Sequence, residues 1–235
     1  TLYDNNVFKL PVGTSTEDRA RVQLLGVAIT ALSQGVAYFH AGIDVLRSKS
    51  MDRNSFDSGD WFNRLDWTYQ TNYFGTGLPP KADNGESWPL MQALLANDTL
   101  RPAPSDIVFA RDVTRDLLAV RESSTLFRLR TAADIRQRLT FPNTGTAQNP
   151  VVLVGHVNGK GYPGSVFKDV LYLINVDKQP QDITIPEEAG KAYQLHPVQA
   201  AGSAADARIR TGARFETGSG RFTVPARSAA VFVTR

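Results

Sequence analysis

Cysteine is missing from the 235-residue sequence, so disulfide bonds are excluded and the composition leaves the redox compartment open. Histidine is scarce, and His40, His156 and His196 lie far apart with no metal-ligand spacing. The G-x-S-x-G, P-loop and H-E-x-x-H motifs are also absent. We therefore expect no cofactor and no metal site in this chain.

Long apolar runs are missing as well. The longest nearly apolar stretch, residues 22–39, is interrupted by Gln, Thr, Ser and Gly, which favours a core helix followed by a strand over a membrane span. The first residues carry neither the basic region nor the apolar core of a signal peptide. Because the sequence starts with Thr1 and not with methionine, we expect a processed chain or a piece of a longer one.

A strong charge of one sign is lacking. The 26 basic residues exceed the 23 acidic ones by only three, and arginine is spread along the whole chain. Proteins that bind nucleic acids usually gather Lys and Arg on one face, so we expect no nucleic-acid partner. A hydrophobic content of 42% is typical of a globular protein, and the length suits one large domain or two smaller ones.

The first half of the sequence predicts helices and one strand. Apolar residues at helical spacing, with Ser15 or Thr16 as a cap, predict a helix over residues 17–33. The short apolar run 36–39 between glycines is typical of a buried parallel strand, which indicates an α/β unit. Residues 41–104 are rich in Gly, Pro and aromatics and predict an ordered loop system at a binding face, and residues 105–124 a second helix.

The residue pattern of the sequence changes near residue 131, where short β-type runs begin to alternate with turn residues. Such a pattern predicts an antiparallel β-sandwich, including a hairpin with a Gly-rich turn at residues 215–222. We divide the chain into residues 1–128 and residues 129–235. The predicted strands are residues 151–157, 170–176, 182–185, 193–198, 214–217, 221–224 and 229–233.

Three features allow more than one interpretation. The Gly159-Lys-Gly-Tyr-Pro-Gly164 run has the spacing of a dinucleotide fingerprint, but Pro163 and the strand that follows favour a loop between strands. His156 and His196 are expected to be satisfied surface or edge residues. His40, at the end of the predicted strand, fits a functional or a packing role equally well.

Residues 46–63 contain the highest concentration of candidate functional side chains, because charged and hydroxyl residues alternate there with aromatics. Polar groups can bond sugar hydroxyls while aromatic faces stack on the ring, so a sugar-binding loop is favoured over a solvated loop. Asp57 and Asp60 invite the idea of a glycosidase acid and nucleophile, but a carboxylate in a Gly-Ser turn is more often a backbone cap.

Phe39-His-Ala-Gly42, Leu46-Arg-Ser-Lys-Ser50 and Asp57-Ser-Gly-Asp-Trp-Phe-Asn63 closely resemble pullulanases and plant limit dextrinases of glycoside hydrolase family thirteen. The resemblance continues in order along nearly the whole chain. It covers Gly77-Leu-Pro-Pro80, Trp88-Pro-Leu90, Ser124-Thr-Leu-Phe-Arg-Leu129, Phe141-Pro-Asn-Thr-Gly145, Leu195-His-Pro-Val-Gln199 and Arg221-Phe-Thr-Val-Pro225.

The resemblance implies a fold and a reaction. The fold is the C-terminal part of a (β/α)₈ TIM barrel, followed by the antiparallel β-sandwich. The helix at 17–33 and the strand at 36–39 would be barrel elements, and residues 105–124 the last barrel helix. The reaction is retaining hydrolysis of α-1,6 branch linkages, with an Asp nucleophile, a Glu acid/base and a second Asp. Thr1-Leu-Tyr-Asp4 matches only the trailing part of the motif holding that second Asp, so we assign no catalytic residue here.

The resemblance also suggests substrate contacts. Arg53 and Asn54 stand where relatives carry an Arg-Asp pair that touches glucose units. Asn54 departs from the pattern, since it loses the charge but keeps an acceptor. Glu86 matches an acidic sugar contact more loosely, and Arg47 completes the predicted set.

These interpretations lead to one main hypothesis and one alternative. The chain is expected to be part of an enzyme acting on pullulan, limit dextrin or branched starch, inactive alone, with the N-terminal remainder of the same enzyme as its partner and no membrane partner. The alternative is a non-catalytic carbohydrate-binding or accessory fragment. Calcium is left possible elsewhere in the parent enzyme. An extracellular or periplasmic bacterial location is favoured over a plastid.

Overall fold

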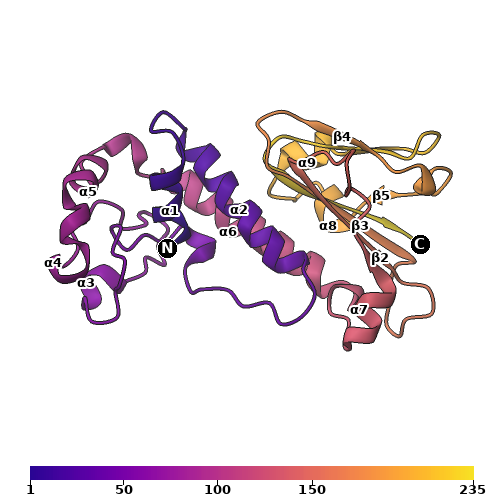
Figure 1. Ribbon diagram of the computed structural model, residues 1–235, viewed down its shortest axis with the longest axis horizontal. Helices are drawn as coiled ribbons and strands as arrows, with labels where there is room; N and C mark the ends of the chain where they lie inside the picture. The colour runs from indigo at the N-terminus through magenta and orange to yellow at the C-terminus, as the bar shows by residue number, and fades with distance from the viewer. The chain divides into compact units, whose positions relative to one another are not determined.

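The computed structural model describes residues 1–235, which fold into two compact units. Unit 1 comprises Thr1–Leu24 and Phe39–Asp112, and unit 2 comprises Leu25–Tyr38 and Val113–Arg235. Helices α2 (Thr16–Leu32) and α6 (Pro104–Glu122) contribute residues to both units (Figure 1). The domain division between residues 128 and 129 stays a prediction.

Helices α2 and α6 confirm the two helices predicted from periodicity. Ser15 caps α2 as expected, because its Oγ accepts a hydrogen bond of 3.2 Å from the backbone of Asp18. Pro104 opens α6, where its missing N–H would be unpaired in any case. Ala28 of α2 and Val120 of α6 are fully or almost fully buried, so the apolar stripes point into the core.

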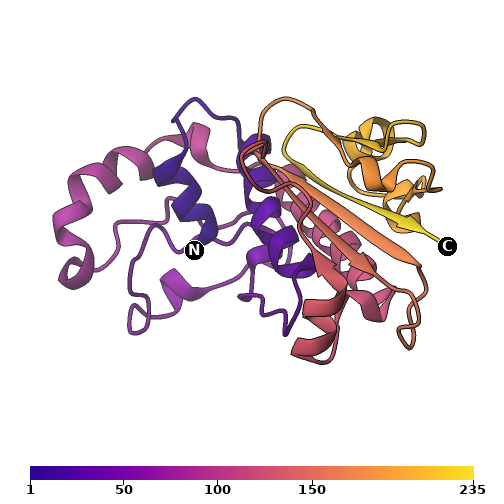
Figure 2. The same cartoon turned by 45° about the vertical axis from the view of Figure 1, so that its right-hand side comes forward.

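The segment between these helices in unit 1 is ordered, as predicted, and it is built from short helices joined by turns (Figure 2). One of them, α5 (Trp88–Leu95), was not predicted, although Pro89 in its first turn is compatible with a helix start. The remaining helices of unit 1 are α1 (Leu2–Lys9), η1 (Ile43–Val45), α3 (Asp60–Asn63), α4 (Lys81–Asn84), η2 (Gly85–Ser87) and η3 (Asp98–Leu100).

Residues 36–39 do not form the predicted parallel strand. The side chains of Val36 and Tyr38 are 97% and 83% exposed, and the segment has no strand beside it. A strand needs a neighbour for its N–H and C=O groups, and the first strand of the chain, β1, begins only at Leu139. Because every pairing in the chain is antiparallel, the expected TIM-barrel portion is wrong, and this chain contains no part of such a barrel.

Unit 2 contains two antiparallel sheets, and strands β2, β3 and β8 run side by side in both views (Figures 1 and 2). The five-stranded sheet has the order β1-β2-β3-β8-β5, and the three-stranded sheet has the order β4-β7-β6. The strands are β1 (Leu139–Thr140), β2 (Val152–Asn158), β3 (Asp169–Asn175), β4 (Gln181–Thr184), β5 (Gln194–Leu195), β6 (Arg214–Glu216), β7 (Arg221–Val224) and β8 (Ser228–Thr234).

Both sheets contribute side chains to a single hydrophobic core. Leu171 and Leu173 enter it from β3, Phe232 from β8, and Phe222 and Val224 from β7. The rings of Phe222 and Phe232 meet edge to face with centroids 5.2 Å apart, a favoured aromatic geometry. The apolar residues of these predicted strands therefore hold the two sheets together.

Most predicted strands match the structure within one residue at each end, but the run at residues 193–198 does not. It is a strand only at Gln194–Leu195, and Pro197 then opens a short helix. No helix of the chain is long and apolar enough to cross a membrane. The helical elements of unit 2 that were not predicted are η4 (Thr125–Phe127), α7 (Ala132–Arg138), η5 (Pro186–Glu188), α8 (Pro197–Ala200) and α9 (Ala207–Gly212).

Candidate functional site

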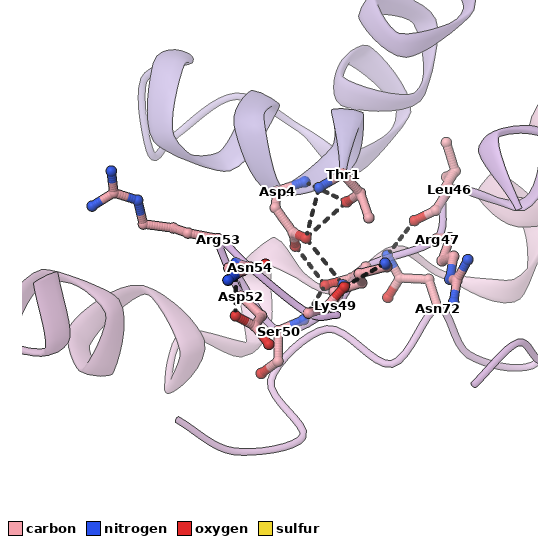
Figure 3. Close-up of polar contacts among 12 residues, drawn as sticks. Thr1, Asp4, Leu46, Arg47, Lys49, Ser50, Asp52, Arg53, Asn54 and Asn72 are labelled. Carbon is pink, nitrogen blue, oxygen red and sulfur yellow. Dashed lines mark hydrogen bonds and ion pairs between the residues drawn. The ribbon is translucent and has the colours of Figure 1, made fainter. Parts of the chain in front are cut away.

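The buried carboxylate of Asp4 fixes the start of the Arg-Ser-Lys-Ser segment (Figure 3). It accepts hydrogen bonds from Ser48 Oγ at 2.5 Å, from the backbone N–H of Lys49 at 3.0 Å and from Thr1 Oγ1 at 2.7 Å. Ser48 Oγ in turn accepts from the backbone of Ser50 at 2.9 Å. Helix α1 thereby holds residues 48–50 in place, with a negative charge satisfied by donors from two parts of the chain.

A second buried pair, Asp52 and Asn84, positions the backbone of Arg53. Asn84 Nδ2 donates to Asp52 Oδ1 at 3.0 Å, and Asn84 Oδ1 accepts from the backbone N–H of Arg53 at 3.0 Å. Asp52 Oδ1 also accepts from the backbone of Asn54 at 3.1 Å, which closes an Asx turn. The side chain of Arg53 extends away from these contacts and is exposed.

Arg53 and Glu86, both singled out from the sequence, line the same pocket of about 570 Å³ in unit 1. We call it the Arg53 pocket. Asn54 belongs to the same region, because its Nδ2 donates to Asp83 Oδ2 at 3.2 Å. The pocket is lined by Arg53, Lys81, Ala82, Asp83, Gly85 and Glu86.

Unlike the other predicted substrate contacts, Arg47 uses its side chain to bond backbone carbonyls within the protein. Its Nη1 donates to the carbonyl of Ala41 at 3.1 Å and its Nη2 donates to the carbonyl of Asn63, so it ties the two ends of the loop together. Burial lowers the pKa of Arg47. It is not among the residues lining the Arg53 pocket. The structure thus brings Arg53, Asn54 and Glu86 together and does not bring Arg47 to them.

Lys49 and His40 lie in a neighbourhood of positive charge around Arg47. Partial desolvation by the surrounding chain first, and then the charge of Arg47, lower the pKa of both side chains. Lys49 Nζ donates to Ser55 Oγ at 2.5 Å, which ties the segment to the next turn. His40 is exposed and is therefore not the packing residue that was one of its two interpretations.

Aromatic rings from residues 56–73 are exposed or partly exposed on unit 1. The guanidinium carbon of Arg64 lies 4.0 Å from the ring centroid of Trp61 and 3.9 Å from that of Tyr73, a cation–π sandwich. Phe56 is 95% exposed. The mixture of polar and aromatic groups seen in the sequence is thus displayed on the surface.

Asp57 and Asp60 have the features of solvated turn residues. Both are exposed, and no hydrogen bond or ion pair holds either carboxylate. No group of three or more His, Asp or Glu side chains is arranged to hold a metal ion. Nothing in the geometry gives these two residues an acid and nucleophile arrangement.

Ser123 and His196 in unit 2 are 3.0 Å apart, yet they are not a nucleophile and its base. His196 Nδ1 accepts the backbone N–H of Val198 at 3.2 Å, so the proton resides on Nε2 and is donated to Ser123. Ser123 donates its own proton to the carbonyl of Val120. A base must accept the serine proton, and this arrangement does the reverse.

His156 is the satisfied histidine that was predicted, since its Nε2 lies 3.0 Å from Asp169 Oδ1. His196 is also satisfied, but it is 1% exposed and lies at the N-cap of α8. The expectation of a surface or edge position on a strand is therefore wrong for His196. Burial lowers its pKa to about 4.

Residues 69–235 match the family described as alpha-1,6-glucosidases, pullulanase-type, C-terminal. The chain belongs to the family of pullulanase-type α-1,6-glucosidase C-terminal regions. It is similar to pullulanase 1, chloroplastic, of Arabidopsis thaliana, with 41% identity over 99% of this chain and 25% of the relative. It is also 30% identical to a pullulanase of Klebsiella pneumoniae, over 98% of this chain and 21% of the relative.

Solved pullulanase structures share the fold. The maltotriose complex of PulA from Klebsiella pneumoniae matches with a TM-score of 0.90 and 29% identity, covering 100% of this chain and 25% of that one. A pullulanase from Bacillus acidopullulyticus shares the fold with a TM-score of 0.64 and 19% identity, over 100% of this chain and 23% of that one. The pullulanase-type chain thus spans about a quarter of the length of its relatives.

The residues that organise the site were not identified from the sequence. Asp4 ends the Thr-Leu-Tyr-Asp run that the resemblance had already marked, which is the one available signal. Asp52 and Asn84 are 32 residues apart, and short polar residues in turns carry no signal of pairing over that distance. Lys81 and Asp83 were overlooked because the Gly- and Pro-rich segment hid the short helix α4.

Proposed function

We propose that this chain is part of a pullulanase-type glycoside hydrolase that cleaves α-1,6-glucosidic branch linkages in pullulan, limit dextrin or starch, and that its own role is to bind the glucan. The supporting observation is the pocket shared by Arg53 and Glu86, with Asn54 hydrogen-bonded to its rim. A retaining reaction needs a carboxylate nucleophile and a carboxylic acid, and we place both in the N-terminal remainder of the enzyme.

The charges of the Arg53 pocket suit a neutral, hydroxyl-rich ligand. Two cations, Arg53 and Lys81, are balanced by two carboxylates, Asp83 and Glu86. Guanidinium and ammonium groups donate to hydroxyl oxygens, and carboxylates accept from hydroxyl hydrogens. A ligand of either charge would meet as much repulsion as attraction, whereas a glucose unit can use donors and acceptors at once.

The anchoring of the pocket supports binding with little loss of entropy. The backbone of Arg53 is held by Asn84, and residues 48–50 are held by Asp4, so the loop is ordered without a ligand. A preorganised site avoids the cost of ordering a flexible loop when the ligand binds. Phe56 does not line the pocket, but its ring, two residues after Asn54, is 95% exposed and can stack on the C–H surface of a further sugar ring.

The decisive experiment separates binding from hydrolysis. The isolated chain is incubated with pullulan and the reducing ends are measured, and the assay is repeated with the N-terminal remainder supplied. We expect no reducing ends from the chain alone and activity after reconstitution. Release of reducing ends by the isolated chain would show that it carries catalytic carboxylates. Inactivity after reconstitution would favour the accessory, carbohydrate-binding alternative.

Binding is measured directly by titrating the isotopically labelled chain with maltotriose. We expect shifts of the backbone resonances of Arg53, Asn54 and Glu86. Cellotriose, which has the same sugar units in β linkage, is the matched control and is expected to cause smaller shifts. Equal shifts with both sugars, or shifts confined to other residues, would contradict the assignment of the Arg53 pocket.

A further inference from the structure

A second pocket, of about 740 Å³, lies in unit 2 beside the loop that joins β2 to β3. We call it the Lys160 pocket. One wall is formed by Gly159, Lys160 and Gly161. They begin the run Gly159-Lys-Gly-Tyr-Pro-Gly164, whose interpretation as a loop between strands is confirmed. The other walls include Ser165, Val166, Lys168 and Lys191.

The loop around this pocket is fixed by its own hydrogen bonds. The backbone N–H of Gly159 donates to the carbonyl of Lys168 at 2.7 Å, and Ser165 Oγ donates to the carbonyl of Gly159 at 3.1 Å. A side chain at position 159 has no room, because its Cβ would lie 2.4 Å from the carbonyl oxygen of Phe167. The pocket is therefore preformed, which favours binding of a small ligand.

The side chains around the Lys160 pocket are mainly cationic. Lys160 and Lys168 are exposed, and no hydrogen bond or ion pair engages their ammonium groups. Arg235 adds a guanidinium, whereas Lys191 is already paired with Glu188, its Nζ lying 2.6 Å from Oε2. Asp169 is the one carboxylate among the lining side chains, and its oxygens already accept from His156 at 3.0 Å and from Thr234 at 3.0 Å. The two unpaired lysines therefore favour an anion.

The pocket also has an apolar side that an inorganic anion would not use. Val166 is 57% exposed and lies next to Ser165, whose hydroxyl can still accept a hydrogen bond. Phe167 is only 4% exposed, so no aromatic face is available for a nucleobase. An aliphatic wall, a hydroxyl and free ammonium groups match a sugar ring that carries a phosphate.

We propose that the Lys160 pocket binds a phosphorylated sugar, with the phosphate held by Lys160 and Lys168 and the C–H face of the ring against Val166. Lysine binds phosphate as a flexible point charge, and two unpaired lysines match the double charge of a phosphomonoester. The proposal goes beyond glucan binding and uses none of the residues assigned to it, so either one can fail without the other.

The test is a titration of the isolated chain with glucose 6-phosphate, glucose and inorganic phosphate at the same ionic strength, followed by calorimetry and by backbone resonances. We expect glucose 6-phosphate to bind at least about tenfold more tightly than either fragment. The shifts should fall on residues 159–168, and added salt should weaken the binding.

Charge-neutralising variants localise the site. Lys160→Gln and Lys168→Gln are each expected to weaken glucose 6-phosphate binding by about tenfold, since each removes a charge-assisted contact. Lys178→Gln, an exposed lysine outside the pocket, is the matched control and should bind like the unmodified chain. All three changes are on the surface, so equal melting temperatures will show that folding is intact.

Four outcomes would overturn the proposal. They are no binding of glucose 6-phosphate at millimolar concentration, an equal loss in the Lys178→Gln control, inorganic phosphate binding as tightly as the sugar phosphate, and glucose binding as tightly as its phosphate. The third outcome would mean a non-specific anion, and the fourth a neutral sugar.

Discussion

The hydroxyl of Ser48 donates a 2.5 Å hydrogen bond to the carboxylate of Asp4 from 44 residues further along the chain. Both side chains are buried, at 1% and 4% exposure. The same carboxylate accepts the backbone N–H of Lys49. A buried charge must be satisfied by donors, and two of those donors, Ser48 and Lys49, belong to the segment that leads to Arg53, for which we propose a glucan contact.

Removal of this contact is expected to destabilise unit 1. Asp4→Ala leaves the Ser48 hydroxyl and the Lys49 N–H buried without an acceptor, so we expect a loss of roughly 3 kcal/mol in the free energy of unfolding, and roughly 1–2 kcal/mol for Ser48→Ala. Urea denaturation measures both. Ser58→Ala, whose hydroxyl makes only an exposed 3.4 Å contact, is the control and should change stability little.

Arg53 is expected to contribute to glucan affinity and not to stability, because its side chain is exposed and holds nothing in place. In the reconstituted enzyme, Arg53→Ala should cost roughly 1.5–3 kcal/mol in kcat/KM on pullulan through the loss of charge-assisted hydrogen bonds. Arg53→Lys keeps the charge but loses the planar fork, so it should recover only part of the activity. Unchanged kinetics for both variants would remove Arg53 from the site.

The elements that were predicted correctly are those whose signal is local. Helices α2 and α6 have their apolar residues at helical spacing, and the strands of unit 2 have apolar residues packed between turns. Residues 36–39 have the composition of a buried strand, yet they are exposed and unpaired. The apolar composition of a segment indicates that it could be buried. A strand forms only if another strand lies beside it to pair with its backbone groups.

The candidate site shows the same limit. Arg53, Asn54 and Glu86 could be named from motif resemblance, and the structure places them in one region. Arg47, from the preceding Arg-Ser-Lys-Ser motif, does not line that pocket and is bonded to the backbone at Ala41 and Asn63. Residue type and motif show which side chains are polar and close in sequence. They do not show which of these side chains form hydrogen bonds within the protein and which remain available to a ligand.

The burial of His196 is expected to make the stability of the chain pH-dependent. Its pKa falls from 6.5 to about 4 because burial disfavours the charged imidazolium, and the charge of Arg235 adds to this. Between these two values the unfolded chain binds a proton that the folded chain does not. The stability contribution is thus complete above about pH 6.5 and is lost as the pH falls towards 4, by about 3 kcal/mol in total.

The measurement is urea denaturation at several pH values from 7.5 down to 4.5. His196→Asn is the diagnostic variant, because asparagine can cap α8 as His196 does but does not titrate. We expect a lower stability at pH 7.5 but a much flatter pH dependence for this variant. An identical slope in both proteins would mean that another group is responsible for the acid sensitivity.

Arg121 is expected to determine how well the end of α2 is ordered. Its guanidinium is buried and donates to the carbonyls of Ala31 at 2.7 Å, Ser33 at 2.9 Å and Gly35 at 2.8 Å, which satisfies acceptors that a helix C-terminus leaves unpaired. Arg121→Lys keeps the charge, but the single ammonium group of lysine cannot reproduce the planar guanidinium, which donates to all three carbonyls. We expect a loss of about 2 kcal/mol in the free energy of unfolding and faster amide exchange at residues 33–38.

Arg128→Lys is the control variant. It alters only an exposed 3.4 Å contact to the carbonyl of Glu122 and should change neither quantity. If the exchange rates of residues 33–38 were the same in both variants, the order of this segment would have to come from its own backbone and not from Arg121.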